Sequence, residues 1–472
     1  MTDSARNCPY FKKCGACQTL NLTYEEELSL KMKRLISLLG RFAHVGEILS
    51  MDKPLCYRNK TQTLFRYNGG RVESGLYRSS DSGIVHVDRC LMEDPDLAPV
   101  TRTVKKLADA YKLKVWDGRR GEMRSVMVRK GFGTGEMQAA IVTKSGMFEG
   151  AAEMAAELVR RHPKIVSVSV IENATQIPLW MNGEEYGVHG PGYLEDVLAG
   201  CRFRVPAKAF YQINPIMTEV LYKTAAEFAE IKSGERVLDA YCGIGTVGIA
   251  AVKGTDARLE GFDVNEDAVR AAGENAELNG IRGARYTQKK DASFLGDGHY
   301  DVIFADPPRA GCDRRFLEAL VRAAPERFVY ISCDPETLAR DLRLLGGTYK
   351  VKKIQPVDMF PGTGHVETVC LLSKLESQPH IEVKLNMSEL DLTKAEKKAT
   401  YQEIKDYVME HTGLKVSSLY IAQVKEKCGI IERENYNKPK SPGAKQAKCP
   451  PEKEKAIREA LRHFGMIPEG TS

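Results

Sequence analysis

The pattern of hydrophobic and polar positions changes twice along the chain and divides it into three regions. In the first 200 residues, short segments in which apolar and polar residues alternate predict half-buried strands. These segments are 61–67, 75–77, 83–87, 124–129, 137–143 and 165–171. Asn68-Gly-Gly70 has the composition of a hairpin turn, and 24–39, 95–113 and 151–161 predict helices. This region therefore predicts an α+β fold with an antiparallel sheet.

From about residue 205 to residue 375 the pattern is different, because short apolar runs alternate with helical stretches. The runs are 237–238, 259–262, 302–305 and 328–331. Strands that alternate with helices are typical of βαβ units, in which helices cover both faces of a parallel sheet. The region therefore predicts an α/β fold with a doubly wound sheet.

The tail from residue 376 predicts a small helical domain. Amphipathic patterns run over 388–410, 417–427 and 452–464, and the segment 438–448 is a basic loop with four lysines and no acid. The predicted division has four parts. They are 1–92, a cysteine-containing segment with short strands; 93–204, a central α+β region that forms one unit with it; 205–375, the α/β domain; and 376–472, the helical domain.

Composition narrows the class of protein. Of 472 residues, 43% are hydrophobic and 28% are charged, which excludes a disordered chain, and no apolar run reaches the ~18–20 residues of a membrane helix. The N-terminus has no basic segment followed by an apolar one, so the cytoplasm is the expected compartment. In that reducing compartment the 12 cysteines are expected to be ligands, a nucleophile or core residues rather than disulfides. A net charge of +6 permits a polyanionic partner without requiring one.

A glycine-rich turn follows the first strand of the α/β domain. Asp239 lies near the end of that strand, and Gly243, Gly245 and Gly248 then form a Gly-x-Gly-x-x-Gly pattern as the next helix begins. Glycines at these positions allow a tight turn and a close approach of a ligand to the backbone. The pattern predicts a nucleoside cofactor and, together with the cysteines, leaves open a nucleotide-dependent iron–sulfur oxidoreductase.

Acidic residues at the ends of the successive strands favour S-adenosylmethionine over a cofactor that contains a pyrophosphate. Asp263 closes the second strand, where it can accept both ribose hydroxyls, and Asp291 near the third can reach an adenine amino group. Asp306 ends the fourth strand and is followed by two prolines. Such a series of acids would repel a pyrophosphate, whereas it suits the positive charges of S-adenosylmethionine. S-adenosylmethionine is therefore the expected cofactor.

A thiol and a carboxylate lie near the same edge of the predicted sheet. Cys333 ends the fifth strand, beside a helix start that predicts a lowered thiol pKa, and Glu367 leads into the last strand. A thiolate that adds to carbon-6 of a pyrimidine makes carbon-5 nucleophilic enough to take a methyl group. A base then removes the carbon-5 proton and the thiolate leaves. This pair predicts methyl transfer to carbon-5 of uracil. A non-catalytic RNA-binding protein with the same fold would need neither residue.

Four motifs follow one another in the second half of the chain. They are Phe210-Tyr-Gln-Ile-Asn214, Asp306-Pro-Pro-Arg309, Ser332-Cys-Asp-Pro335, and Asp358-Met-Phe-Pro361 with His365-Val-Glu367. Together they resemble the RNA 5-methyluridine methyltransferase family, and the likeness runs from about residue 8 to residue 374. It implies a class I Rossmann-like S-adenosylmethionine-dependent domain, with Cys333 as nucleophile and Glu367 as the proton-abstracting base. The residues that it implies at the cofactor are Gln212, Tyr241, Asp263, Asp291 and Asp306, beside Gly243 and Gly245.

Four further cysteines form a candidate metal site. Cys8, Cys14 and Cys17 lie near the N-terminus, and Cys90 could supply a fourth thiol. Four thiols hold either a zinc ion or an iron–sulfur cluster, and their spacing does not decide between the two. Family members that act on ribosomal RNA have a similar arrangement, and this resemblance implies a 4Fe–4S cluster.

The resemblance also implies structured RNA as the partner, with 23S rRNA as the expected substrate and tRNA as the alternative. No membrane and no obligate protein partner is expected. The residues expected to form an RNA surface are Tyr57, Arg58, Asn59, Lys60, Arg66, Arg119, Arg120, Arg124, Arg129 and Lys130. The helical domain 376–472 is a second candidate for RNA binding.

Overall fold

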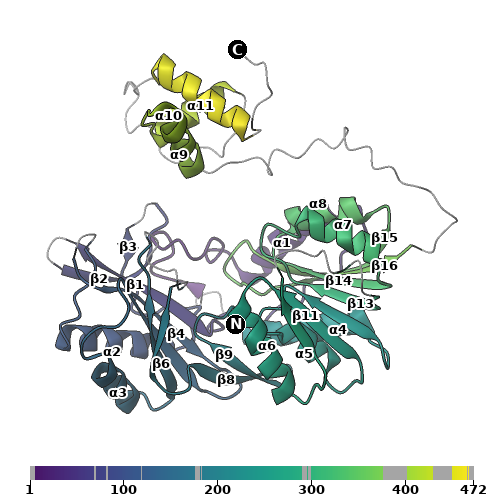
Figure 1. The fold of residues 1–472 in the computed structure, drawn as a ribbon, viewed down its shortest axis with the longest axis horizontal. Coiled ribbons are helices and arrows are strands. Elements are labelled where there is room, and N and C mark those ends of the chain that lie inside the picture. Colours follow the sequence, from purple (N-terminus) through teal and green to yellow (C-terminus); the bar gives the residue numbers. More distant parts are fainter. Residues whose placement is uncertain are drawn as a thin grey trace. The chain divides into compact units, whose positions relative to one another are not determined.

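The computed structural model describes residues 6–68, 71–80, 83–117, 120–175, 181, 183–289, 295, 299–375, 401–428, 449–464 and 466. The chain forms two compact units, Met1–Pro379 and His380–Ser472. The first unit contains two seven-stranded sheets, and the second contains the last three helices (Figure 1). Among the described residues, no helix combines the length and the apolar character that crossing a bilayer requires.

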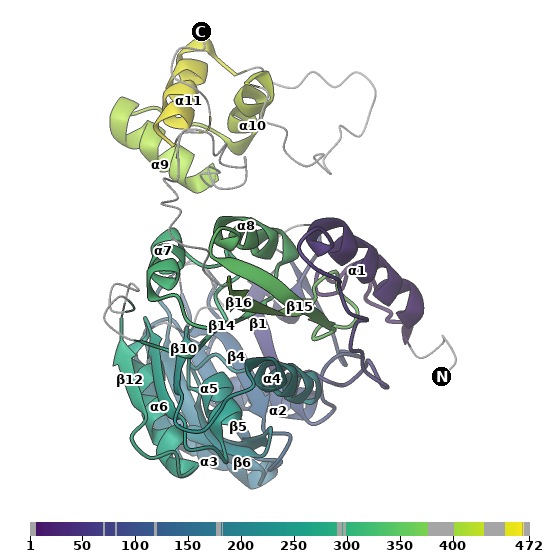
Figure 2. The same ribbon diagram turned by 90° about the vertical axis from the view of Figure 1, so that its right-hand side faces the viewer.

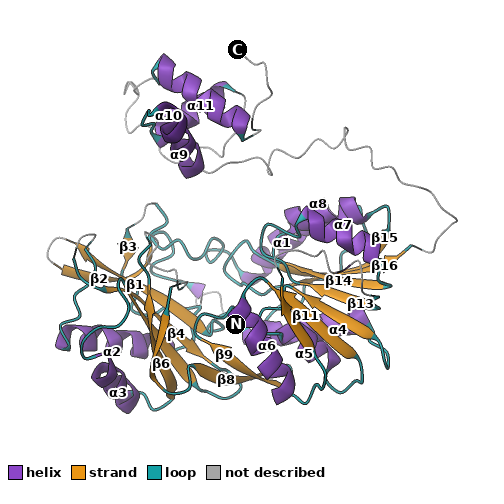
Figure 3. Cartoon of the chain, viewed as in Figure 1, coloured by secondary structure: helices purple, strands orange, loops and turns teal. Residues whose placement is uncertain are grey.

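The first sheet has the strand order β3-β2-β1-β4-β5-β6-β7. Its strands are β1 (Lys60–Asn68), β2 (Arg71–Tyr77), β3 (Ile84–Val85), β4 (Met123–Lys130), β5 (Met137–Thr143), β6 (Ile165–Glu172) and β7 (Glu185–His189). Helices α2 (Leu97–Ala110) and α3 (Ala151–Arg161) cover one face of it (Figure 3). The predicted antiparallel sheet is confirmed with one exception. Strands β5 and β6 are parallel, because α3 crosses over between them.

The second sheet has the strand order β12-β11-β10-β13-β14-β16-β15. Its strands are β10 (Arg236–Ala240), β11 (Arg258–Asp263), β12 (Arg285–Gln288), β13 (Val302–Ala305), β14 (Arg327–Ser332), β15 (Tyr349–Val357) and β16 (Glu367–Lys374). The first five strands from the β12 edge are parallel, and β16 and β15 are antiparallel to their neighbours. A hairpin of β8 (Tyr193–Leu198) and β9 (Cys201–Pro206) precedes this sheet in the chain.

Helices cover both faces of the second sheet, which confirms the predicted doubly wound, Rossmann-like architecture. Helices α4 (Pro215–Ala229), α5 (Thr246–Val252) and α6 (Glu266–Leu278) pack on one face. Helices α7 (Arg314–Ala323), α8 (Pro335–Leu345) and α1 (Tyr24–Leu39) pack on the other (Figure 2). Helix α1 thus comes from the N-terminal region but contributes Leu35 and Leu39 to the core beneath the second sheet. Its sequence pattern predicted the helix but not this partner.

The described part of the second unit is a cluster of three helices. Its helices are α9 (Tyr401–Thr412), α10 (Ser418–Lys427) and α11 (Pro451–His463). Their apolar faces meet in a core that includes Ile404, Val408, Ile421, Val424, Ile457 and Leu461. The helices predicted at 417–427 and 452–464 are confirmed. Part of the predicted helix 388–410, up to residue 400, and the basic segment 438–448 lie outside the described residues.

Candidate functional site

The glycines after β10 allow a tight connection between that strand and α5. Gly243 and Gly245 have φ angles of 53° and 83°, which other residues seldom adopt. The N–H of Gly248, in the first turn of α5, donates to Asp239 Oδ2 at 2.9 Å. A Cβ atom at residue 248 would lie 2.8 Å from the Cβ of Asp239. Glycine therefore lets α5 approach β10 closely.

Replacement of Gly248 by alanine is expected to weaken S-adenosylmethionine binding about tenfold and to destabilise the protein by about 1–3 kcal/mol. The added methyl group overpacks the contact with Asp239 and must displace the turn. Gly273 in α6 is the matched control, because a Cβ atom there meets nothing within 4 Å. Calorimetric titration with the cofactor and urea unfolding measure the two effects. Equal affinities in both variants would contradict the prediction.

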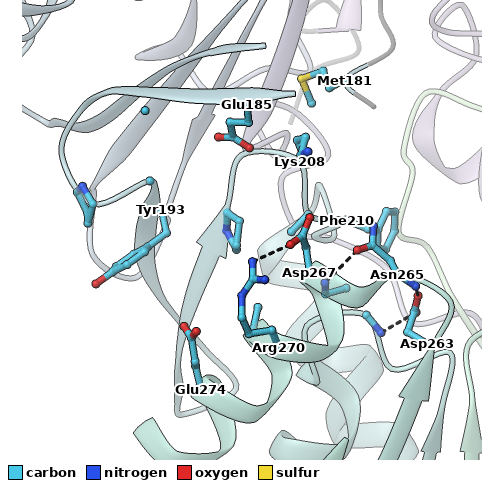
Figure 4. A pocket seen from close by; sticks show the side chains of 18 of the residues that line it. Met181, Glu185, Tyr193, Lys208, Phe210, Asp263, Asn265, Asp267, Arg270 and Glu274 are labelled. Atoms are coloured by element: carbon cyan, nitrogen blue, oxygen red, sulfur yellow. Dashed lines mark hydrogen bonds and ion pairs between the residues drawn. The ribbon is translucent and has the colours of Figure 1, made fainter. Parts of the chain in front are cut away.

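Asp263 ends β11, and its carboxylate is fixed by two backbone N–H groups. Gly243 donates to Oδ2 at 3.0 Å, and Asn265 donates to Oδ1 at 2.9 Å. The residue lies in the wall of a pocket of about 1210 Å³, large enough for a nucleoside. Figure 4 shows Asp263, Asn265 and Phe210 at one end of this pocket. The Phe210 side chain there is 70% exposed.

The charges on the pocket walls favour a positively charged ligand over a phosphate. Its acidic lining residues are Glu184, Glu185, Asp263, Asp267 and Glu274, and its basic lining residues are Lys208 and Arg270 (Figure 4). Arg270 is paired with Asp267 at 2.7 Å. The excess of acidic side chains in the pocket lining therefore fits the sulfonium and ammonium charges of S-adenosylmethionine.

The other predicted cofactor residues lie at different depths. Gln212 is 6% exposed in the segment before α4. The Tyr241 backbone has a φ of 60°, and its ring packs against Phe262 and Phe316 with centroids 5.8 and 5.3 Å away. Asp291 lies outside the described residues. Their contacts with the cofactor stay predictions.

Cys333 and Glu367 are brought together by the antiparallel pairing of β14 with β16. Ser332, the last residue of β14, pairs with Thr368, so Cys333 directly after β14 and Glu367 at the start of β16 flank this last pair. The Glu367 carboxylate is near enough to the Cys333 thiol to raise the pKa of that thiol. Asp306 follows β13, the parallel neighbour of β14, at the same edge of the sheet. A thiol and two carboxylates therefore share this edge.

Burial controls the protonation of these three groups. The Glu367 side chain is buried, the residue being 3% exposed, and its Oε2 has no hydrogen-bond partner among the described residues. Burial, reinforced by the nearby Asp306 carboxylate, raises the pKa of Glu367 well above its ordinary value. Burial likewise raises the pKa of Asp306 to about 7. Two adjacent buried carboxyl groups hold protons more strongly than either would in water.

The prediction of a lowered pKa for the Cys333 thiol is wrong for the free protein. Burial raises the pKa of Cys333 to about 12, the Glu367 and Asp306 carboxylates add to the increase, and Arg309 only partly opposes it. Helix α8 does begin two residues later, at Pro335, but desolvation and two nearby acids act on the thiol in the opposite direction. The thiol is therefore neutral before a substrate arrives.

One polar side chain near this edge, Tyr222, had no signal in the sequence. Tyr222 is a buried α4 residue whose hydroxyl lies 2.8 Å from Thr246 Oγ1, at the start of α5. Burial raises its pKa, and the Asp306, Asp239 and Glu367 carboxylates add to the increase. Tyr222 belongs to no motif, and its position against these acids depends on how α4 packs on the sheet.

The four cysteines predicted as ligands line one cavity, although they come from separate segments. Cys8, Cys14, Cys17 and Cys90 share it with apolar side chains. Burial raises the pKa of Cys17 to about 11 and that of Cys90 to about 12. A bound cation would offset the cost of ionising such thiols, so the donor set fits a metal or cluster. Within the described ranges, no three or more His, Cys, Asp or Glu side chains already converge as a metal site.

The prediction of an RNA surface at residues 57–60, 66, 119–120, 124 and 129–130 is wrong for several of these residues. Arg129 is 0% exposed and donates to the backbone oxygens of Pro206 at 3.0 Å and Ala209 at 2.8 Å, just before Phe210. Tyr57, Asn59, Arg124 and Lys130 are among the others that bond within the unit. Arg119 lies outside the described residues. These side chains are buried or half-buried and bind neighbouring segments of the same unit.

Comparison with known proteins agrees with this geometry. Residues 193–375 match the model of the tRNA (uracil-5-)-methyltransferase family. An uncharacterized RNA methyltransferase of Listeria innocua is 34% identical over 382 residues, which cover 78% of this chain and 83% of the relative. One from Bacillus cereus is 31% identical over the same length.

A solved structure extends the comparison to three dimensions. The Pyrococcus abyssi tRNA (uracil-54, C5)-methyltransferase, in complex with S-adenosyl-L-homocysteine, is 27% identical with a TM-score of 0.63. The likeness covers 76% of this chain and 86% of that one, so it extends beyond the second sheet. It favours methyl transfer over the oxidoreductase alternative. A likeness of this extent, in sequence and in fold, places the chain in the RNA uracil-5-methyltransferase family, as an S-adenosylmethionine-dependent enzyme.

Proposed function

We propose that the enzyme methylates carbon-5 of a uridine in 23S rRNA through a covalent adduct with Cys333, which Glu367 resolves. The observation that supports this best is that Cys333 and Glu367 flank the last residue pair between β14 and β16, at one edge of the sheet. The chemistry needs a nucleophile at carbon-6 and a base at carbon-5, which are adjacent atoms of one ring.

In the first step the Cys333 thiol gives its proton to solvent and its sulfur adds to carbon-6, while the electrons of the carbon-5–carbon-6 double bond move toward the carbon-4 oxygen. Carbon-5 then becomes a nucleophile. S-adenosylmethionine, when bound, supplies the methyl group as an electrophile. Asp263 and the turn that holds Gly243 and Gly245 would hold its nucleoside, and Asp306 lies between this turn and the thiol along the sheet edge. A target base in folded RNA must be swung out to reach this edge.

In the last step Glu367 removes the proton from the methylated carbon-5. The double bond forms again, and the thiolate leaves carbon-6. A carboxylate with a raised pKa is a stronger base than an exposed one, which suits removal of a proton from carbon. The buried Oε2 of Glu367 has no partner to compete for that proton in the described structure.

The choice of 23S rRNA rests on the cysteine set, and tRNA is the alternative because the Pyrococcus abyssi relative acts on tRNA uracil-54. Mapping 5-methyluridine across total RNA, from cells with and without this gene, tests the choice. We expect loss of the modification from 23S rRNA while tRNA is unchanged. Loss from tRNA alone would overturn the substrate and leave the chemistry intact.

We also propose that Cys8, Cys14, Cys17 and Cys90 hold a 4Fe–4S cluster, supported by the cavity that they share. Protein purified without oxygen should contain iron and acid-labile sulfide and should absorb visible light. Replacement of Cys90 by serine should remove most of the iron. Zinc in place of iron would overturn the proposal.

The helical unit is the second candidate RNA-binding part. We propose that residues 376–472 add affinity for RNA, which their basic segment 438–448 supports. A chain that ends at residue 375 should bind RNA more weakly and with a smaller dependence on salt, while its affinity for S-adenosylmethionine is unchanged. Unchanged RNA affinity would contradict this role.

A further inference from the structure

The loop 358–366 connects β15 to β16 and ends directly before Glu367. Val357, the last residue of β15, pairs with Glu367, so this loop closes on the proposed base. The position of the Glu367 carboxylate therefore depends on how loop 358–366 is held. Hydrogen bonds hold the loop at Asp358, Phe360, Pro361 and Gly362.

Helix α1 holds one side of the loop through buried polar side chains. Lys31 Nζ donates to Asp358 Oδ1 at 2.7 Å and to the Phe360 oxygen at 3.2 Å. It also donates to Glu27 Oε1 at 2.7 Å, and the Gly362 N–H donates to the same oxygen at 2.8 Å. We call Tyr24, Glu27 and Lys31 the α1 clamp. Tyr24 completes it, because its hydroxyl donates to Asp358 Oδ2 at 2.7 Å.

A second set of contacts to the loop comes from the segment that follows Cys17 and from Tyr57. The N–H groups of Gln18 and Thr19 donate to the Gly362 oxygen at 3.0 and 3.1 Å. The Tyr57 hydroxyl donates to the Pro361 oxygen at 3.0 Å. The loop is therefore held by two sets of hydrogen bonds, and both come from residues that are distant in sequence.

Burial shows that the clamp fixes geometry more than it adds stability. The side chains of Glu27, Lys31 and Asp358 are 0%, 3% and 0% exposed, and Arg6 pairs with the second Glu27 oxygen, so two acids face two bases. Apolar residues of similar size usually stabilise a buried contact as well as an ion pair does. Apolar residues could not, however, bind loop atoms in one fixed arrangement, which this network does.

We propose that the α1 clamp is a positioning device for the proposed base. It holds loop 358–366 so that Glu367 lies against carbon-5 of the uracil once the Cys333 adduct has formed. The proposal rests on the proposed function, because it assigns the clamp to the step that Glu367 performs. No clamp residue touches the reacting atoms, so each acts through the position of Glu367.

Replacement of Lys31 by methionine tests the proposal in the full-length protein. A displacement of a catalytic group by 1 Å can cost about 100-fold in rate. We expect kcat to fall about 10- to 100-fold while KM for RNA changes little. A covalent protein–RNA adduct should accumulate, because resolution of the adduct is the slowed step. Denaturing gels of enzyme with labelled RNA measure the adduct, and Lys31→Arg should reduce it by restoring a donor.

Two further variants separate positioning from folding. In Lys31→Met/Asp358→Asn one base and one acid are removed together while Arg6 stays paired with Glu27, so no uncompensated buried charge is left, and the adduct should still accumulate. Arg327→Met removes a pair with Glu235 at the start of β14, far along the strand from Cys333. That control should lower stability without accumulation of adduct.

The outcomes distinguish this proposal from the one on which it rests. If Glu367→Gln accumulates adduct but the folded Lys31→Met and Lys31→Met/Asp358→Asn variants do not, the clamp proposal is overturned and the base assignment stands. If Glu367→Gln itself accumulates none, the base assignment fails and the clamp proposal fails with it. Accumulation in all of these variants, and not in Arg327→Met, supports both.

Discussion

Replacement of Cys333 by alanine should abolish methyl transfer while S-adenosylmethionine still binds. Carbon-5 of uracil is too weak a nucleophile to take a methyl group unless a thiolate has first added to carbon-6. Loss of an essential nucleophile typically costs on the order of 10⁴-fold or more in kcat. Transfer of labelled methyl groups to RNA measures the loss, and calorimetric titration measures the affinity for the cofactor.

A second thiol in the same sheet is the control for this variant. Cys370 is fully buried in β16, where it pairs with Tyr330, and it lies away from the edge that holds Glu367. Replacement of Cys370 by alanine should cost some stability through lost packing, and turnover per folded molecule should be unchanged. Equal losses of turnover in the two variants would show that the Cys333 result reflects folding rather than chemistry.

Replacement of Glu367 by glutamine should trap a covalent protein–RNA adduct. The amide has the shape of the carboxyl group but cannot take the carbon-5 proton, so the thiolate cannot leave carbon-6. Turnover should fall on the order of 10³-fold while methyl transfer into the adduct continues. Denaturing gels should show a band that carries both protein and labelled methyl groups. A variant that turns over slowly without this band would contradict the role.

The pH dependence of product release gives a second test of the role of Glu367. Its pKa is raised by burial, so the ionised form that acts as a base increases as pH rises through that value. Release of product by the natural enzyme should therefore become faster as pH increases, and Glu367→Gln should lose that increase. Glu336→Gln is the matched control, because Glu336 is an exposed residue at the start of α8. It should keep both the rate and the pH profile.

The fold could be predicted from the sequence to the extent that it depends on near neighbours along the chain. Alternation over 124–129 and 137–143 predicted β4 and β5, and Gly243, Gly245 and Gly248 predicted the turn after β10, because each pattern reflects the local geometry of one element. The residue types of Cys333 and Glu367 predicted the reaction, since few other reactions need this thiol and this base.

Only the tertiary structure decided the surroundings of these residues. It raised the pKa of Cys333 where the nearby helix start predicted the opposite, because burial and two carboxylates act across strands. It buried Arg129, and it set Lys31 against Asp358, 327 residues away in the sequence. Sequence patterns predict secondary-structure elements and candidate catalytic residues because both are visible in local spacing. The protonation state, the burial and the contact partners of a side chain depend on distant segments of the chain, which local spacing does not encode.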